Sequence, residues 1–415
     1  MNRKFFLILF ASLLLRIFLL LSAHHGDLNN NISWGEQLVL RGTNFFYEGK
    51  NWPYSAPNQP PLTVLMFGAL MWLFQTIDTG ARILNDKLSL FPSTFIWFWE
   101  QHGKDILVKL PSVFADLAIG YIIYKYFNQL NKRKTAITMC TLWLFNPVVW
   151  FNSSVWGQTD PIVNLLGLLG VVALLRKKLE RVAVWVTLSI LFKGSLFIFA
   201  PVLLFVALTQ KYKPRVWGNA LLVSVITLYI VCWPLHPYFD IPFWLGNLYI
   251  RQILPGEIGF LTANAFNFWW LVDPGKTLDT TVYLGLPAKI WGYLIALTGI
   301  SFILYRLREK LDDKRVFWAL SVSALITFLF LTRIHERYLY PFFPAGTILA
   351  GLSPAFLAPY LILSAAHLFN LFNLFPMPVP IDIQFLYNSL WFIPTFCTIT
   401  LIVLFWILKD TKKYT

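Results

Sequence analysis

The chain has 415 residues, of which 57% are hydrophobic and only 13% are charged. Soluble domains carry about 25% charged residues, so this composition excludes a sizeable soluble domain and predicts a polytopic membrane protein. The net charge of +14 at first suggests a nucleic-acid-binding protein, but 21 of the 34 Lys and Arg residues fall in short segments between apolar stretches. These segments are Arg3–Lys4, Lys125–Lys134, Arg176–Arg181, Lys211–Arg215, Arg306–Arg315 and Lys409–Lys413.

Basic loops mark the cytoplasmic face of a membrane protein. The charge pattern therefore predicts membrane orientation, with membrane lipids and no nucleic acid as the partner of the basic segments. The N-terminal apolar stretch has no convincing small-residue cleavage site and is interrupted by Arg16, so we interpret it as the first spanning helix and not as a signal peptide.

Stretches of about 20 apolar residues predict twelve spanning helices. They lie near residues 4–23, 108–127, 134–152, 160–176, 181–194, 195–209, 216–234, 286–304, 316–331, 337–351, 354–372 and 386–408. Residues 60–77 and 88–100 either span the membrane or lie along its surface, which gives twelve to fourteen spans. The predicted fold class is an all-α polytopic membrane protein, with residues 1–415 forming one transmembrane domain.

Two long loops are predicted on the extracytoplasmic face, at residues 24–59 and 235–285. The first contains a short amphipathic segment, Trp34–Leu40, which we expect to rest on the membrane surface. The second is rich in aromatic residues and proline, so we expect interfacial helices over the bundle. Because the polar loops on this face carry few basic residues but gather Asp, His, Glu, Gln and Trp, we expect the chemistry to take place there.

Asp27 follows the first span directly and stands beside Gly26, which allows a ligand to approach the backbone closely. A rigid carboxylate at the membrane surface is suited to act as general base for an acceptor hydroxyl, whereas the alternative is a solvated loop acid. His24 and His25 could join Asp27 in a metal site. Adjacent histidines rarely reach the same ion, so a divalent metal is possible but we expect neither a metal nor another cofactor.

Three further residues are candidates for binding an anion. His335 and Arg337 lie in one short loop, and Arg offers a planar fork that matches phosphate. Lys193 lies between two short spans, at the start of a half-helix whose free N–H groups favour an anion. Glu336 could orient either loop neighbour. The alternative for these cations is that they extend toward the membrane surface from helix ends.

The segment from Trp156 to Asp160 ends one span and precedes the next. Trp156 could stack on a sugar ring, and Gln158 could form a hydrogen bond with its hydroxyl groups. Asp160 stands before Pro161, so it either contacts the sugar or caps the following helix.

Other polar and sulfur-containing residues have structural interpretations. Arg16 and Asp116 both fall within apolar stretches, where an isolated charge is costly, so we predict a structural ion pair. All three cysteines lie in apolar segments and fit neither a disulfide framework nor a metal site, so we predict that they are packing residues.

Taken in order, these motifs resemble those of the GT-C superfamily of integral-membrane glycosyltransferases, which use polyprenyl-phosphate sugars as donors. The likeness is strongest to dolichol-pathway glucosyltransferases and related bacterial and archaeal mannosyltransferases. The chain departs from the family pattern in having Lys109 where Arg is usual and in lacking the second acid of an Asp-x-Asp pair after Asp27. The motifs in question are Gly26-Asp27, Pro60-Pro61-Leu62-Thr63, Lys109-Leu110-Pro111 with Asp116, Trp156–Asp160, Lys193 and His335–Tyr338.

The resemblance implies an inverting hexosyltransferase with a polyprenyl-phosphate hexose as donor and a glycan, lipid or protein as acceptor. Lys193, His335 and Arg337 would hold the donor phosphate, and Asp27 would take the proton of the acceptor hydroxyl. The enzyme would lie in the plasma membrane of a prokaryote or the endoplasmic reticulum of a eukaryote. A flippase or transporter of a lipid-linked sugar is the alternative, since broken helices and intramembrane charges also suit transport. An enzyme using a pyrophosphate-linked donor is a third possibility.

Overall fold

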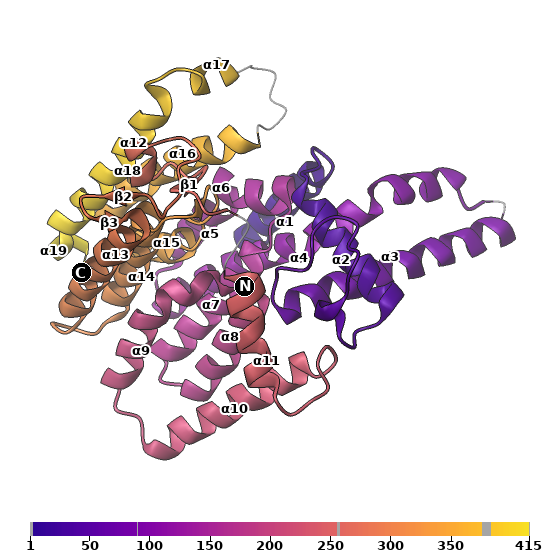
Figure 1. Ribbon diagram of the computed structural model, residues 1–415, viewed down its shortest axis with the longest axis horizontal. Coiled ribbons are helices and arrows are strands. Elements are labelled where there is room, and N and C mark those ends of the chain that lie inside the picture. The colour runs from indigo at the N-terminus through magenta and orange to yellow at the C-terminus, as the bar shows by residue number, and fades with distance from the viewer. Residues whose placement is uncertain (1–2, 89, 255–257, 376–382, 415) are drawn as a thin grey trace.

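The computed structural model describes residues 3–88, 90–254, 258–375 and 383–414, and helices make up almost all of its regular structure (Figure 1). The helices of the first half are α1 (Arg3–Leu20), α2 (Asp27–Arg41), α3 (Pro61–Lys87), α4 (Ser93–Gln129), α5 (Arg133–Phe145), α6 (Pro147–Trp150), α7 (Asp160–Leu175), α8 (Leu179–Phe192), α9 (Ala200–Thr209) and α10 (Pro214–Cys232). Those of the second half are α11 (Ile241–Leu248), α12 (Phe268–Val272), α13 (Ala288–Leu307), α14 (Asp313–Phe330), α15 (Phe342–Leu352), α16 (Leu357–Leu374), α17 (Gln384–Tyr387), α18 (Phe392–Lys409) and α19 (Thr411–Tyr414).

Shorter elements fill the gaps between these helices. There are 3₁₀ turns at η1 (Phe46–Glu48), η3 (Gly194–Phe199) and η5 (Pro354–Phe356), and π-helical turns at η2 (Phe151–Trp156) and η4 (Tyr249–Ile253). Two-residue strands form a parallel pair, β1 (Thr262–Ala263) with β4 (Ile334–His335), and an antiparallel pair, β2 (Val282–Tyr283) with β3 (Leu286–Pro287).

The predicted fold class is confirmed. Within the described residues, six helical segments are long and apolar enough to cross a membrane: Pro61–Lys87, Ser93–Gln129, Pro214–Cys232, Ala288–Leu307, Pro354–Leu374 and Phe392–Lys409. Further apolar helices are shorter, among them Asp160–Leu175 and Phe342–Leu352. The chain is thus an all-α, multi-pass membrane protein, while the number of twelve to fourteen spans stays a prediction.

The region that the sequence leaves ambiguous forms a long helical hairpin. Residues 61–77 belong to α3, which continues to Lys87, and residues 93–100 are the start of α4 and not a separate span. The 37 residues of α4 extend about 55 Å, well beyond the roughly 30 Å hydrocarbon thickness of a bilayer. Figure 1 shows this hairpin projecting from the rest of the molecule on the right.

The amphipathic helix of the first loop is longer than predicted and packs on protein. Helix α2 starts at Asp27, and its buried face includes Trp34 and Leu38. Two glycines allow α2 and α3 to approach closely: a Cβ at Gly35 would lie 2.5 Å from the Phe67 carbonyl oxygen, and a Cβ at Gly68 would clash with Leu38 Cδ2. Contact with α3 therefore accounts for the apolar face that the sequence assigned to the membrane surface.

The second long loop contains α11, η4, α12, β1 and β2, while residues 255–257 of that loop lie outside the described residues. The loop thus contains helices, while their position at the membrane interface stays a prediction. The pairing of β1 with β4 was not predicted, and it joins Ala263 in this loop to His335.

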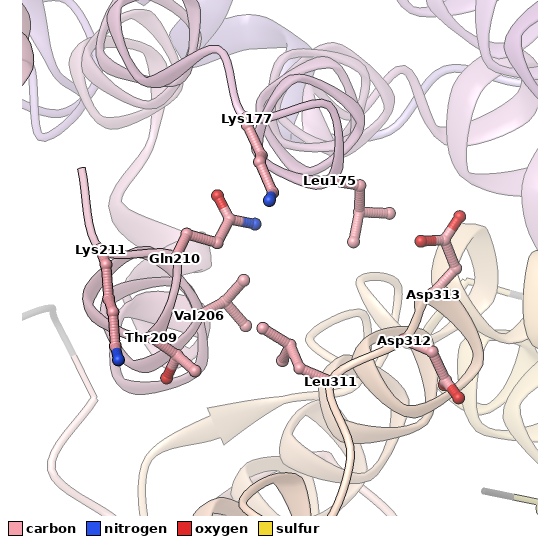
Figure 2. Close-up of a pocket in the computed structure, with 9 residues that line it drawn as sticks. All are labelled: Leu175, Lys177, Val206, Thr209, Gln210, Lys211, Leu311, Asp312 and Asp313. Carbon is pink, nitrogen blue, oxygen red and sulfur yellow. The ribbon is translucent and has the colours of Figure 1, made fainter.

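The basic segments gather at one end of the helices. Three of the loops that carry them, α7–α8, α9–α10 and α13–α14, line a shared cavity of about 360 Å³ (Figure 2). The α4 terminus reaches this end as well, because Tyr126 donates to Asp313 (2.6 Å). The start of α1 lies beside it, since Phe5 stacks on Tyr124 with ring centroids 4.1 Å apart. The shared end agrees with the predicted grouping of the basic segments on one face.

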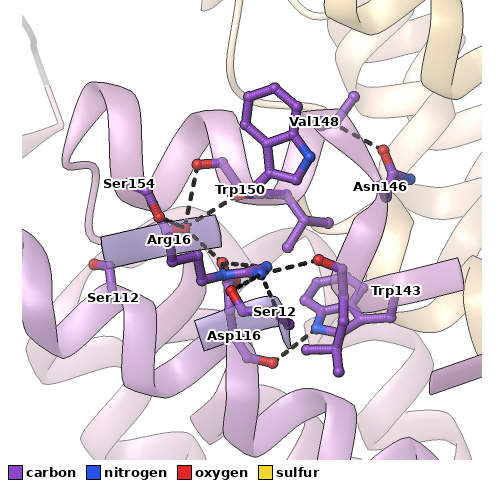
Figure 3. A network of polar contacts seen from close by, with 12 residues as sticks. Ser12, Arg16, Ser112, Asp116, Trp143, Asn146, Val148, Trp150 and Ser154 are labelled. Carbon is purple, nitrogen blue, oxygen red and sulfur yellow. Dashed lines mark hydrogen bonds and ion pairs between the residues drawn. The ribbon is translucent and has the colours of Figure 1, made fainter. Parts of the chain in front are cut away.

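The predicted ion pair between Arg16 and Asp116 is confirmed and forms the centre of a buried network (Figure 3). Arg16 Nη2 lies 3.2 Å from Asp116 Oδ2, and both side chains are inaccessible to solvent. Ser153 and Tyr340 donate to the two oxygens of the same carboxylate, at 2.6 and 2.8 Å. Helices α1 and α4 are thereby joined to η2 and to the segment before α15. The three cysteines are free and buried, as predicted.

Candidate active site

Asp27 is the first residue of α2, where an acidic side chain interacts favourably with the helix dipole. Its Oδ2 accepts hydrogen bonds from Gln158 Nε2 at 2.7 Å and from Trp156 Nε1 at 3.2 Å. On the other side, His25 Nδ1 lies 3.5 Å from Asp27 Oδ1. The carboxylate side chain remains 39% exposed, so it is held on several sides and still accessible to a ligand.

The two donors to Asp27 come from an irregular stretch between α6 and α7. The π-helical turn η2 ends at Trp156, and Gly157 follows with φ +79°, a left-handed conformation that favours glycine. Gly157 lies between Trp156 and Gln158, and the side chains of these two residues reach the same oxygen of the Asp27 carboxylate. The sequence predicted a polar junction here, but it gave no sign of the π-helical turn.

Lys193 lies at a helix break, as predicted. Helix α8 ends at Phe192, Lys193 is extended, and the 3₁₀ turn η3 begins at Gly194. Lys193 Nζ lies 2.8 Å from Asp160 Oδ1, and both side chains are largely buried. Asp160 is the first residue of α7, while Thr159 occupies the cap position without a side-chain cap bond. The alternative in which Asp160 caps this helix is therefore wrong, and its visible role is to pair with Lys193.

The loop before α15 brings His335, Glu336 and Arg337 to the same place. Glu336 is fully buried, and its Oε1 accepts from Arg337 Nη1 at 2.7 Å. His335 Nδ1 is farther away, at 3.9 Å from Glu336 Oε2. Of the two neighbours that Glu336 could orient, Arg337 is the one it binds directly. Arg333 contributes elsewhere, because its Nε lies 2.7 Å from Asp279 in the second long loop.

Aromatic rings connect these segments. The Arg337 guanidinium lies 5.8 Å from the ring centroids of both Trp156 and Tyr338, within the range of cation–π attraction. Lys193 Nζ lies 5.9 Å from the Tyr338 centroid. We call the assembly of Asp27, Trp156, Gln158, Asp160, Lys193, His335, Glu336 and Arg337 the outer cluster. The structure thus brings every predicted site residue into one place, although they come from four separate parts of the sequence.

The electrostatics of the outer cluster favour particular protonation states. Burial would raise the pKa of Asp27, but Arg337, His25 and the two hydrogen bonds together outweigh burial and hold the pKa below its ordinary value. Burial, with repulsion from Arg337 and Lys193, lowers the pKa of His335 to about 3. At neutral pH, Asp27 is therefore ionised and His335 is neutral, so His335 can offer an N–H donor but no positive charge.

Several buried atoms in the outer cluster have no hydrogen-bond partner among the described residues. They are Asp160 Oδ2, Glu336 Oε2 and Arg337 Nε. Buried polar groups are usually satisfied, and an unsatisfied one costs about 1–3 kcal/mol. Unused donors and acceptors beside an accessible carboxylate are the arrangement expected of a site that completes its bonds with a polar ligand.

The histidines of the first loop point to different partners. His24 Nδ1 lies 2.7 Å from Asp105 Oδ2, whereas His25 contacts Asp27. Within the described ranges, no group of three His, Cys, Asp or Glu side chains is placed to hold a metal ion. The expectation that the site works without a metal stays a prediction.

Sequence reasoning missed contacts that hold the site in place. Lys109 donates to the carbonyl oxygens of Leu20 and Ala23, and Ser112 Oγ donates to the Gln158 carbonyl at 2.6 Å. The signal was present as polar residues at helical spacing in α4, but the partners could not be read from the sequence because they are backbone atoms of other segments.

Two known proteins are similar in sequence to part of this chain, and both are glycosyltransferases. The chain is 30% identical over 126 residues to GPI mannosyltransferase 1 of Candida albicans, a match that covers 29% of this chain and 30% of the relative. It is 28% identical over 161 residues to GPI mannosyltransferase 1 of Saccharomyces cerevisiae, covering 37% of this chain and 38% of the relative. The matched parts thus span less than two fifths of either relative. No family model matches the chain. Over part of its length the chain is similar to GPI mannosyltransferases, which confirms the predicted resemblance to the GT-C superfamily.

Proposed function

We propose that the chain is an inverting mannosyltransferase that moves mannose from a polyprenyl-phosphate donor to an acceptor hydroxyl. The observation that carries this proposal is the outer cluster itself. An ionised, accessible carboxylate, two largely buried cations and two aromatic rings converge from distant parts of the chain. Mannose is the sugar because both relatives are mannosyltransferases, and a GPI-type glycolipid is the first acceptor to test for the same reason.

The two cations suit the donor phosphate. Arg337 offers a planar fork with its Nε unpartnered among the described residues, and Lys193 supplies a second positive charge from the opposite segment. Glu336 pairs with Arg337, and Asp160 pairs with Lys193. Negative charge grows on the phosphate as the glycosidic bond breaks, so cations fixed in place stabilise the transition state more than the bound donor.

Asp27 is suited to receive the acceptor proton. In the proposed step, the acceptor oxygen forms a bond to the anomeric carbon while the bond from that carbon to the phosphate oxygen breaks. The proton passes to the Asp27 carboxylate, and polyprenyl phosphate leaves with the electron pair. Because the pKa of Asp27 is depressed, this carboxylate is always ionised at neutral pH but is a weak base. Proton transfer therefore occurs late, as the attacking oxygen becomes acidic.

The remaining residues fit recognition of the sugar and acceptor. Tyr338 provides a ring face beside Arg337, and Gln158 provides an amide beside Asp27. Trp156 is fully buried, so it acts by donating to Asp27 and by packing under Arg337, and not by stacking on the sugar as the sequence suggested. The basic loops lie at the opposite ends of α1 and α4 from these residues, which supports an extracytoplasmic site in the plasma membrane or endoplasmic reticulum.

The proposal can be tested with the purified chain in liposomes. The donor is radiolabelled polyprenyl-phosphate mannose, with nucleotide-linked mannose and polyprenyl-phosphate glucose as controls and a GPI-type glycolipid as acceptor. The expected product is a mannosylated acceptor formed from polyprenyl-phosphate mannose alone, with or without EDTA. Movement of the intact donor between leaflets without any glycosidic product would instead identify a flippase, and use of nucleotide-linked mannose would refute the donor assignment.

A further inference from the structure

One face of α4 carries a row of polar residues that contacts three of the segments around Asp27. Asp105, Lys109, Ser112 and Asp116 are spaced by four, three and four residues, which places them on the same side of a helix. We call these four residues the α4 stripe. Three of them are buried, although α4 is among the apolar helices long enough to cross a membrane. Burial of so many polar groups requires partners along the whole row.

The partners of the α4 stripe are parts of the proposed site and its supports. Asp105 pairs with His24 in the loop that carries Asp27. Ser112 donates to the Gln158 backbone. Asp116, at the inner end, receives Arg16 from α1. The stripe therefore touches the end of α1, the first outer loop and the segment that supplies both donors to Asp27.

Lys109 touches both the end of α1 and the segment that supplies the donors to Asp27 with one side chain. Its Nζ donates to the Leu20 carbonyl at 2.9 Å and to the Ala23 carbonyl at 2.6 Å, where α1 ends. These carbonyls lack helical partners, and a cation satisfies them. Its stem packs on Gly157: a Cβ at Gly157 would lie 2.9 Å from Lys109 Cγ.

The contact between the Lys109 stem and Gly157 affects the site because of where Gly157 lies. It stands between Trp156 and Gln158, the two residues whose side chains donate to Asp27. Lys109 therefore holds the chain leading into Asp27 with its ammonium group and the backbone between the two donors with its stem. Burying an ammonium group costs desolvation free energy even when carbonyl oxygens accept its hydrogen bonds. An apolar side chain would fill the same space at a lower free-energy cost.

We propose that Lys109 is a positioning residue that sets the distance between Asp27 and its donors, Trp156 and Gln158. This inference rests on the proposed role of Asp27 as the base. Lys109 touches no reacting atom in this scheme and acts through the geometry of the carboxylate. A misplacement of about 1 Å in a catalytic group can cost about 100-fold in rate.

The test compares variants of the full chain in liposomes with polyprenyl-phosphate mannose. Lys109→Met keeps the length of the stem and removes the ammonium group, while Lys109→Arg keeps a donor for the two carbonyls. Lys104→Met is the matched control, because Lys104 lies on the same helix, is 38% exposed and pairs with Glu36. Each variant is measured for kcat, for donor KM, for thermal unfolding and for the pH dependence of kcat.

Lys109→Met should lower kcat by about 10-fold to 100-fold with donor KM nearly unchanged. Lys109→Arg should recover most of the turnover, and Lys104→Met should match the wild type. Loosened hydrogen bonds stabilise the Asp27 carboxylate less, so the acid limb of the kcat profile should move to higher pH in Lys109→Met. The charged groups facing Asp27 are His25, His335, Glu336 and Arg337. No hydrogen bond or ion pair joins Lys109 to any of these described residues.

The outcome separates positioning from a structural role. If Lys109→Met loses turnover only in proportion to folded protein, with the acid limb at the wild-type pH, the proposal is overturned. Should Lys109→Met not fold, Asp105→Asn at the outer end of the stripe provides the same comparison: a shifted limb supports the proposal and an unshifted limb overturns it. An Asp27→Asn variant is measured in parallel. Wild-type turnover in Asp27→Asn refutes the base itself, whereas an inactive Asp27→Asn beside an unshifted Lys109→Met refutes only the positioning.

Discussion

The molecule contains two clusters of interacting charges that differ in how completely their bonds are made. In the buried network around Arg16 and Asp116, both side chains are inaccessible, and the carboxylate accepts from Arg16, Ser153 and Tyr340. In the outer cluster, Asp27 is 39% exposed, and buried atoms of other acids and of Arg337 lack partners among the described residues. Saturated charges fix helices to one another, whereas incompletely bonded charges beside an opening are ready to bind a ligand.

The two clusters differ in how completely their hydrogen bonds are made and not in residue type, because both combine arginine with acids. A buried ion pair is tolerated when its remaining hydrogen bonds are filled by the protein. In the outer cluster, some of these hydrogen bonds are not made by the described residues, and a ligand could make them. Its cations are held by Glu336 and Asp160, each of which keeps one unpartnered oxygen within the described part of the chain.

The largest expected effect is on turnover through Asp27. Asp27→Asn keeps the shape of the side chain and removes its basicity, so kcat should fall by about 10²-fold to 10⁴-fold while donor binding stays near that of the wild type. The measurement is single-turnover transfer together with donor binding in liposomes. Glu36→Gln is the control, because Glu36 pairs with Lys104 on the surface and should tolerate the change. Loss of activity in Glu36→Gln with retention in Asp27→Asn would show that the wrong acid is assigned as the base.

The next effect is on stability through the buried network. Asp116→Asn leaves Arg16 without its countercharge in a site that solvent does not reach, so the free energy of unfolding should fall by about 3–5 kcal/mol. Thermal unfolding in detergent measures the loss. The surface ion pair of Asp78 with Arg82 provides the comparison, since Asp78→Asn should change stability much less. Equal losses in the two variants would contradict the structural role of the buried pair.

A related effect concerns the donor phosphate. Arg337→Ala should cost about 2–5 kcal/mol of transition-state free energy, the scale for losing a buried charged partner. Arg333→Ala is the matched control in the same loop, because Arg333 pairs with Asp279 and is 40% exposed. The readout is kcat/KM for polyprenyl-phosphate mannose. Turnover in Arg337→Ala equal to that in the wild type would remove Arg337 from the phosphate site.

The smallest effect is the pH dependence of stability through His335. Its pKa is lowered to about 3 by burial and by Arg337 and Lys193, so the unfolded chain binds a proton below about pH 6.5 while the folded chain does not. Stability therefore falls as pH decreases, by about 2 kcal/mol between pH 7 and pH 5 from this group. His335→Gln should reduce that dependence in thermal unfolding curves. An unchanged slope would mean that His335 is protonated in the folded protein.

Sequence patterns were sufficient for the fold class and for the membership of the outer cluster. Long apolar stretches predict helices through composition alone, and the polar residues at their ends mark the sites where charges can be tolerated. The helix break at Lys193 was predictable because two short apolar spans meet there. The Arg16–Asp116 pair was predictable because a charge within an apolar helix requires a partner.

Other features depend on contacts that no local pattern encodes. The pairing of Ala263 with His335 joins segments far apart in the chain, and the π-helical turn before Trp156 has no clear sequence signal. The amphipathic face of α2 was visible, but whether protein or lipid covers it depends on the glycines that allow α3 to approach. Lys109 was noticed only as a motif residue, since its partners are carbonyl oxygens of α1.

The most direct test of the contrast between the clusters is transfer activity per folded molecule, measured side by side for Asp27→Asn and Asp116→Asn. Single-turnover transfer from polyprenyl-phosphate mannose is divided by the folded fraction determined in the same liposomes. If the outer cluster performs the chemistry, Asp27→Asn is folded and nearly inactive, whereas Asp116→Asn is less stable but active in the molecules that remain folded. An active Asp27→Asn beside an inactive, fully folded Asp116→Asn would contradict this assignment and place the chemistry at the buried pair.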